Sequence, residues 1–208
     1  MVQPTRPGTS EQAGDASVAP APAAAGPDRP RRADARQNRA RILAAAREAF
    51  ATEGSDAQMG PIARRAGVGV GTLYRNFPTK EALITELARV WTVERADDAL
   101  RALRLGDPWQ ALTAYVESHA WAVRDSAGLQ AIFDEVQSRE AASDEGRRLA
   151  AALSELLGRA RTAGVLREDI VLGDFQALLC GVSAAIAHGG DPRRCATVLL
   201  DGMRRATA

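Results

Sequence analysis

Apolar and polar residues follow one another along most of the chain with the 3.6-residue period of an α-helix. Between Asp34 and Glu53, apolar side chains recur every three or four positions, while arginine and glutamate occupy the other faces. Similar patterns continue to Arg205, and no stretch shows the period of two that marks a β-strand. The pattern predicts an all-α protein of about nine helices without a sheet.

Glycine, proline and short polar side chains mark where these helices begin and end. Gly54 and Gly164 follow periodic segments and are expected to end them. Thr79 and Asp107 precede periodic segments and are expected to cap them with a side-chain oxygen. The expected helices run over residues 34–53, 59–66, 70–77, from 80 onward, 108–125, 129–137, 143–163, 174–187 and 192–205.

The composition changes once along the chain. Residues 1–33 are rich in proline and alanine, lack a periodic apolar pattern and predict a disordered tail with a basic end. An N-terminal helical domain should follow at 34–95, and a C-terminal helical domain at 96–208. No apolar run approaches the roughly 20 residues of a membrane-spanning helix, and the tail lacks the apolar core of a signal peptide. We therefore expect a cytoplasmic protein without a membrane partner.

Charge is distributed unevenly although the whole chain carries a net charge of only +1. Residues 29–80 contain eleven Arg and Lys against four Asp and Glu, whereas residues 81–208 have an acidic excess of four. This asymmetry favours a polyanionic partner at one end of the molecule. A charge run taken alone is more often only a solvated face.

The segment from Gln58 to Phe77 has the pattern of a helix-turn-helix. It consists of a helix, a glycine-containing turn at 67–69, a short second helix and a proline that stops it. In the second helix, Leu73 and Phe77 are one turn apart and should face Ile62 of the first helix to form a small core.

The outward face of the second helix then carries the polar residues. Arg75 can bind guanine with two hydrogen bonds, Asn76 can reach adenine or a phosphate, and the methyl group of Thr72 can touch thymine. Gly71 permits close approach to the DNA backbone, and Lys80 supplies a cation for a phosphate. These residue types in this order indicate recognition in the major groove.

Residues 41–83 resemble the TetR (tetracycline repressor) family of bacterial regulators. The positions that carry the resemblance are Arg41-Ile42-Leu43-Ala44-Ala45-Ala46, Phe50, Gly54, Ile62-Ala63, Ala66-Gly67-Val68, Gly71-Thr72-Leu73-Tyr74, Phe77-Pro78 and Lys80-Glu81-Ala82-Leu83. The resemblance implies an Ω-shaped homodimer with two N-terminal heads in successive major grooves and a variable C-terminal body. The chain departs from the family pattern at Gly69, where a hydroxyl residue often caps the recognition helix, and at Met59-Gly60-Pro61.

By motif position, the resemblance implies that Tyr74 and Lys80 contact phosphates, while Thr72 and Arg75 enter the groove. It also implies that the start of the recognition helix lies against the DNA. Together with the polar face described above and the basic lead-in described next, the predicted DNA-contacting residues are Val70, Gly71, Thr72, Tyr74, Arg75, Asn76, Lys80, Arg36 and Arg39.

A cluster of arginines precedes this domain at positions 29, 31, 32, 36 and 39. It has two interpretations. It could be a flexible arm that follows the DNA backbone or enters a minor groove, or it could be a tail that only keeps the protein soluble. The sequence leaves both open.

The last two expected helices carry wide apolar faces, which in the family pair with their twofold mates as a four-helix bundle. The alternative is the core of a single protomer. A dimer is favoured because two heads must be held about 34–36 Å apart to meet a palindrome. The predicted interface residues are Phe175, Leu178, Leu179, Val182, Ile186, Val198, Leu199 and Met203.

An effector pocket is expected among the fourth to seventh predicted helices, between residues 80 and 163. Aromatic residues with a few polar groups suit a small-molecule cavity, although aromatics at helical spacing more often form plain core. The candidates are Trp91, Tyr115, His119, Trp121 and Phe133. His119, midway along an apolar helix, is more typical of a hydrogen-bonded core histidine, and Cys180 and Cys195 are more typical of buried reduced thiols.

The sequence thus predicts a sequence-specific transcriptional regulator, a ligand-relieved repressor that acts as a homodimer on a palindromic operator. Its partners would be double-stranded DNA, a second copy and a small-molecule effector. The alternative keeps the DNA-binding head but makes the body a protein-interaction or purely architectural dimerisation module without an effector. No nucleophile–base pair, metal cluster or carboxylate pair is evident. We therefore expect no catalytic residue, metal or cofactor.

Overall fold

A computed structural model of the chain describes residues 28–126, 129 and 142–205, and within these ranges the protein is all-α, as predicted. The elements are α1 (Asp28–Glu53), the 3-10 helix η1 (Gly54–Asp56), α2 (Met59–Arg65), α3 (Val70–Asn76), α4 (Lys80–Ala102), α5 (Pro108–Arg124), α8 (Asp144–Thr162), α9 (Leu172–Ala187) and α10 (Pro192–Met203). The helix predicted over 129–137 lies outside the described residues except for Leu129. In the described part of the chain, no helix is both long and apolar enough to cross a membrane.

The expected helix boundaries follow from local chemistry. Gly54 and Gly67 have φ angles of 58° and 65°, a left-handed conformation that glycine adopts without steric cost. Thr79 Oγ1 accepts a hydrogen bond from the Ala82 amide at 3.1 Å and caps α4. Asp107 caps α5 in the same way, and Pro108 occupies the first turn, where no intrahelical N–H donor is needed.

Three helix boundaries differ from the prediction by two residues or more, and one of them is the start of α9, which lies at Leu172 and not at Asp174. The helix α1 begins at Asp28 and not after Asp34, so the end of the predicted disordered tail is helical. A first-turn acid, a proline at the third position and a run of arginine and alanine are all compatible with a helix start. The helix α10 ends at Met203 because Arg204 leaves the helix to form a β-bridge with Leu166.

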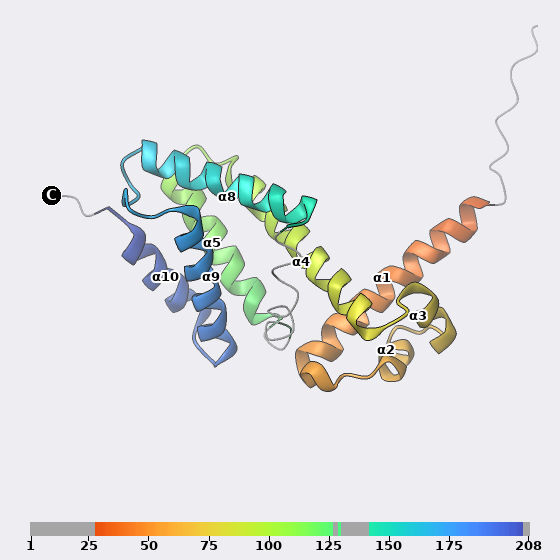
Figure 1. Cartoon of the computed structure of the whole chain (residues 1–208). Helices are drawn as coiled ribbons and strands as arrows, with labels where there is room; N and C mark the ends of the chain where they lie inside the picture. The colour runs from red at the N-terminus through yellow and green to blue at the C-terminus, as the bar shows by residue number, and fades with distance from the viewer. Residues whose placement is uncertain (1–27, 127–128, 130–141, 206–208) are drawn as a thin grey trace, which may run out of the picture.

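Figure 1 shows two groups of helices, and the buried side chains form a separate core in each. The head core is built from α1, α2, α3 and the first half of α4, and the body core from the end of α4 with α5, α8, α9 and α10. Trp91, near the middle of α4, packs against both clusters. The predicted boundary between residues 95 and 96 therefore falls inside one continuous helix, so that helix joins the head to the body.

Ion pairs hold α4 to both of its neighbours. Arg39 of α1 contacts Glu86 at 3.0 Å, Glu86 contacts Arg89 at 3.0 Å, and Arg89 contacts Glu145 of α8 at 2.8 Å. The hydrogen bond from Arg89, with a further contribution from Arg39, lowers the pKa of Glu86. A continuous chain of charges thus runs from the head across α4 to the body.

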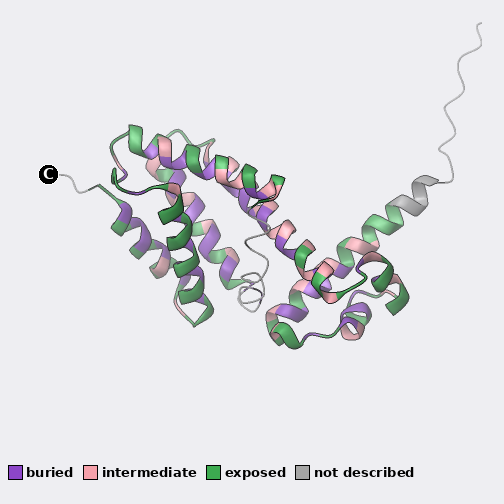
Figure 2. Ribbon diagram, viewed as in Figure 1, coloured by how far each residue is buried: buried purple, intermediate pink, exposed green. Residues whose placement is uncertain are grey.

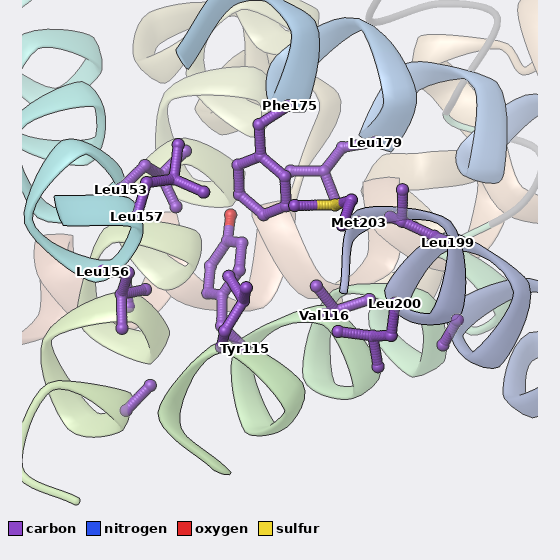
Figure 3. Packing of buried hydrophobic residues seen from close by; sticks show 14 of the residues in the cluster. Tyr115, Val116, Leu153, Leu156, Leu157, Phe175, Leu179, Leu199, Leu200 and Met203 are labelled. Carbon is purple, nitrogen blue, oxygen red and sulfur yellow. The ribbon is translucent and has the colours of Figure 1, made fainter. Parts of the chain in front are cut away.

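The body core is centred on aromatic rings (Figure 3). Tyr115 of α5 and Phe175 of α9 lie with their ring centres 6.2 Å apart, and both are almost fully buried. Figure 3 shows the Tyr115 hydroxyl pointing toward the space between Phe175 and the leucines of α8. Helices α5, α8 and α9 therefore meet around Tyr115.

Candidate functional site

The helix-turn-helix has the geometry that its sequence predicts. Leu73 and Ile62 are completely buried, and Phe77 is 2 % exposed in the same head core. The turn is closed by backbone hydrogen bonds from Gly67 and Val68 to carbonyl groups of α2. The predicted packing of α3 against α2 is confirmed, and it fixes which face of α3 points outward.

That outward face carries an exposed patch of apolar and cationic residues. Val70 and Tyr74 are 45 % and 47 % exposed, and Gly71 and Arg75 are also exposed. No side chain caps α3 at Gly69, in agreement with the glycine found where the family often has a hydroxyl residue. Exposed hydrophobic side chains that form a contiguous patch are typical of a surface that contacts a partner, whereas single ones are ordinary.

The polar residues of α3 are held against their own helix. The Arg75 Nε donates to the Gly71 carbonyl at 3.2 Å, and its Nη2 donates to Thr72 Oγ1 at 3.0 Å. Asn76 Nδ2 donates to the Thr72 carbonyl at 2.8 Å. Arg75 therefore lies along an exposed surface with donors left for a ligand, whereas the Asn76 amide helps to close the last turn of α3.

Three further predicted DNA contacts lie around α3. Lys80 donates to the Ser55 carbonyl and lies 5.7 Å from the centre of the Phe50 ring, and an ammonium group has three donors in all. Arg36 is exposed on α1. The Arg39 guanidinium lies 4.5 Å above the Phe77 ring, in addition to its ion pair with Glu86. Arg39 thus has a structural role inside the head.

In the body, three of the predicted pocket residues come together. The His119 ring centre lies 6.3 Å from those of both Trp91 and Tyr115. Tyr115 and His119 are 2 % and 8 % exposed, and Trp91 is half-buried. These three side chains come from α4 and α5, in the part of α4 that passes from the head core to the body core.

His119 is hydrogen-bonded on one side only. Its Nε2 lies 3.0 Å from Ser183 Oγ, and that hydroxyl donates to the Leu179 carbonyl at 2.9 Å. The Ser183 oxygen therefore accepts from His119, which places the histidine proton on Nε2. His119 Nδ1 is buried and has no hydrogen-bond partner within the described structure. Burial, with the nearby Arg95 charge, lowers the pKa of His119 to about 4, so the ring is neutral near pH 7.

Sequence reasoning missed Arg95, which lies beside this histidine in the core. Its Nη2 pairs with Asp98 at 2.7 Å, its Nη1 donates to the Ser118 carbonyl at 3.3 Å, and its guanidinium lies 4.8 Å above the Trp91 ring. Its Nε is buried and has no partner among the described residues. Burial lowers the pKa of Arg95. The signal that could have identified Arg95 is its spacing from Asp98, since an arginine and an aspartate three positions apart on a helix can form an ion pair and be buried together.

The prediction that Trp121 lines the pocket is wrong. Trp121 is 39 % exposed and is covered on one face by the Arg124 guanidinium at 4.6 Å. It follows His119 by two positions, which turns it about 200° around α5 and away from the cluster. Phe133 lies outside the described residues.

The predicted dimer residues divide into two groups. Leu178 and Val198 are exposed by 41 % and 68 %, whereas the others are buried in the core of their own protomer: Phe175, Leu179, Val182, Ile186, Leu199 and Met203. Figure 2 shows much of the outer surface of α9 as exposed. Cys180 lies on this exposed surface and is not buried as predicted. Leu178 and Val198 are therefore open to a partner, and Val182, Leu199 and Met203, although mostly buried, also line the groove described next.

The exposed surfaces of α9 and α10 enclose a groove of about 680 Å³. Its walls are mostly apolar and small, and the residues that matter here are Ala177, Leu178, Gly181, Ala185, Val198 and Gly202. Glycine and alanine let a neighbouring helix approach closely. The groove combines five of the predicted interface residues, Leu178, Val182, Val198, Leu199 and Met203, with small residues that the prediction did not include.

Comparisons with known proteins match both halves of the chain. The family of bacterial regulatory proteins named tetR matches residues 42–87, and the C-terminal domain of SbtR-like transcriptional regulators matches residues 107–205. No curated protein matches the chain.

Solved structures are similar over most of the chain. A TetR regulatory protein from Mycobacterium vanbaalenii is 35% identical, with 85% of this chain and 100% of that chain covered and a TM-score of 0.60. The TetR regulator SCO0520 from Streptomyces coelicolor is also 35% identical, with 81% and 99% covered and a TM-score of 0.61. The TetR-like regulator LfrR from Mycobacterium smegmatis, solved in complex with proflavine, is 24% identical, with 80% and 94% covered and a TM-score of 0.62.

Family matches thus cover both the helix-turn-helix head and the body, and two relatives at 35% identity are matched over nearly their full length. The chain belongs to the TetR family of bacterial DNA-binding transcriptional regulators.

Proposed function

We propose that this regulator is a cytoplasmic homodimer that represses transcription by binding a palindromic operator through α3, and that a small molecule bound in the body relieves the repression. The observation that carries the proposal is the outward face of α3, where Arg75 and Tyr74 are exposed above a completely buried Leu73. A rigid helix with that division of faces fits the major groove.

The residues of α3 have separate roles in this proposal. Arg75 reads a base edge, because a guanidinium can donate two hydrogen bonds to guanine. Tyr74 and Lys80 bind phosphates that flank the groove and set the position of the helix. Val70 and Gly71 lie against the DNA, and Thr72 orients Arg75 through the 3.0 Å hydrogen bond between them.

A second copy of the chain is the proposed occupant of the groove on α9 and α10. Leu178 and Val198 would enter between small residues of the partner, and the contact would continue the helix packing of the body. The reason for two copies is geometric, because one α3 reads too few base pairs to be specific and two must be held one helical turn apart.

The effector is proposed to bind beside Trp91, Tyr115 and His119. His119 Nδ1 is a buried acceptor without a partner and Arg95 Nε is a buried donor without a partner in the described structure, and each such atom costs about 1–3 kcal/mol. A ligand hydroxyl or carboxylic acid group has the donor that His119 Nδ1 lacks and the acceptor that Arg95 Nε lacks. Binding there could reach the head because Trp91 contacts both cores, and it would shift DNA affinity only through unequal affinity for two conformations.

A second candidate is a body that only dimerises and takes no ligand. It is favoured by the close burial of Tyr115 and His119, which are 2 % and 8 % exposed. Thermal-shift screening of metabolites and drugs against the wild type and a His119→Leu variant separates the two candidates. A ligand that stabilises the wild type but not the variant supports the effector site.

The DNA-reading role is tested with Arg75→Ala. The variant should bind a duplex selected by the wild type more weakly by about 1–3 kcal/mol and should lose discrimination at one base position in each half-site. Competition assays with duplexes changed at single positions measure both effects. The control is Arg104→Ala, since Arg104 is exposed in the turn after α4. If Arg75→Ala keeps the full base preference of the wild type, α3 does not read DNA through this residue.

A further inference from the structure

The first part of α1 extends beyond the head. In Figure 1 the N-terminal half of α1 projects from the head on the side where α3 lies. Residues 33–37 are all exposed, and the segment matched by the family begins only at residue 42. The family match therefore does not include this extension, and its role has to be argued from its own residues.

Four arginines recur along the extension at positions 29, 32, 36 and 39. These spacings of three, four and three residues place the positions within about 80° of one face of the helix. Asp34 lies on the opposite face, roughly 180° from the centre of the row, and Arg31 lies roughly 120° away from it. We call the four positions the arginine row.

The last member of the row fixes its direction. Arg39 lies 4.5 Å above the ring of Phe77, the residue that directly follows α3, and pairs with Glu86 at 3.0 Å. Because α1 is a continuous helix from Asp28 to Glu53, this contact orients the earlier positions of the row. The row therefore starts at the end of the recognition helix and runs outward from it.

The arginines of the row are not explained by a contribution to the stability of α1. Positions 29 and 32 lie in the first turns of α1, where the positive end of the helix dipole disfavours a positive charge. Arg36 is exposed, and no ion pair involving it is found in the described structure. Arg39 is held inside the head by Glu86 and Phe77 and anchors the row. The charges at positions 29 and 32, in contrast, disfavour the helix start, and the exposed Arg36 has no acidic partner among the described residues, as expected for a surface that meets an anion.

We propose that the arginine row binds the phosphate backbone of duplex DNA beside the segment read by α3. The inference rests on the proposed DNA-binding function and extends it. Positions 29 to 39 span about 15 Å along the helix, which matches roughly four base pairs at 3.4 Å each. The row lengthens the footprint on each side of the operator and adds affinity that does not depend on sequence.

The test compares Arg32→Gln/Arg36→Gln with the charge-matched control Arg104→Gln/Arg193→Gln, which removes two exposed arginines from the body. Binding to mixed-sequence duplexes of 18 and 34 base pairs is measured over a range of salt concentrations. The dependence of log K on log salt should become shallower by about 3.6 in the row variant, since each lost phosphate contact removes about 0.9 and the proposed dimer loses two contacts from each of its two protomers. The loss should be larger on the longer duplex, and the control should match the wild type.

Two further variants make the outcome decisive. Arg32→Lys/Arg36→Lys should keep the wild-type salt dependence, because a phosphate needs only the charge, and Arg31→Gln should change it less than Arg32→Gln. Equal behaviour of the row variant and the body control on both duplexes would overturn the proposal, as would equal losses for Arg31→Gln and Arg32→Gln. If the wild type ignores both duplexes at low salt, the proposed function itself fails, a result distinct from either.

Discussion

His119 and Arg95 illustrate what single residues decide in the body. Both are buried, both are partly hydrogen-bonded, and each keeps one polar atom without a partner in the described structure. The sequence identified His119 as a residue of interest because a histidine interrupts an apolar helix face. Ser183, whose hydroxyl oxygen accepts a hydrogen bond from His119, belongs to α9 and lies 64 positions further along the chain. No local sequence pattern links the two residues.

The histidine makes stability depend on pH. Its pKa is about 4 in the folded protein and about 6.5 when exposed, so the unfolded chain binds more protons between these values. Stability is therefore fully present above pH 6.5 and falls as the pH drops toward 4. Between pH 7.5 and pH 5 the wild type should lose about 2 kcal/mol of unfolding free energy through this residue.

Urea unfolding of His119→Leu measures this effect, because the variant should lack that part of the loss. The control is His188→Leu, since His188 is exposed, and it should follow the wild type. Equal pH dependence in the wild type and His119→Leu would show that the histidine is not buried in its neutral form.

At the scale of elements, helices α9 and α10 show that a periodic apolar pattern does not reveal what its apolar face packs against. Periodicity correctly identified two apolar faces, but a helix with a wide apolar face can bury it in its own protomer or against a partner. Phe175 and Leu179 face the protomer core, whereas Leu178 and Val198 face outward, and only the packed structure separates these sides. Caps and glycine turns, in contrast, were predictable because their hydrogen bonds lie within a few residues of sequence.

The outward face of α9 and α10 predicts how the proposed dimer can be broken. Leu178→Glu should dissociate the dimer without loss of helix, because it buries charge in an apolar groove against the partner. Leu105→Glu is a matched control, since Leu105 is also 41 % exposed but lies in the turn after α4. Sedimentation analysis at micromolar concentration, together with circular dichroism, measures both. A Leu178→Glu protein that remains dimeric would place the interface elsewhere.

At the scale of the whole molecule, α4 is the element that joins the head to the body. It contributes to the head core through Leu83 and Leu87 and to the body core through Ala99 and Ala102, with Trp91 between them. The chain of ion pairs from Arg39 through Glu86 and Arg89 crosses the same helix. A change in the body near Trp91 therefore has a short physical route to α3. The sequence predicted a boundary near residue 95 but could not show that one helix spans it.

Selection of bound duplexes from a random-sequence pool by the full chain, followed by sequencing, tests the central claim most directly. A dimer with α3 in two successive major grooves should enrich an inverted repeat whose half-site centres lie about 10–10.5 base pairs apart, or a multiple of that spacing. Recovery of the starting pool unchanged, or of a single half-site without its inverted mate, would contradict the account.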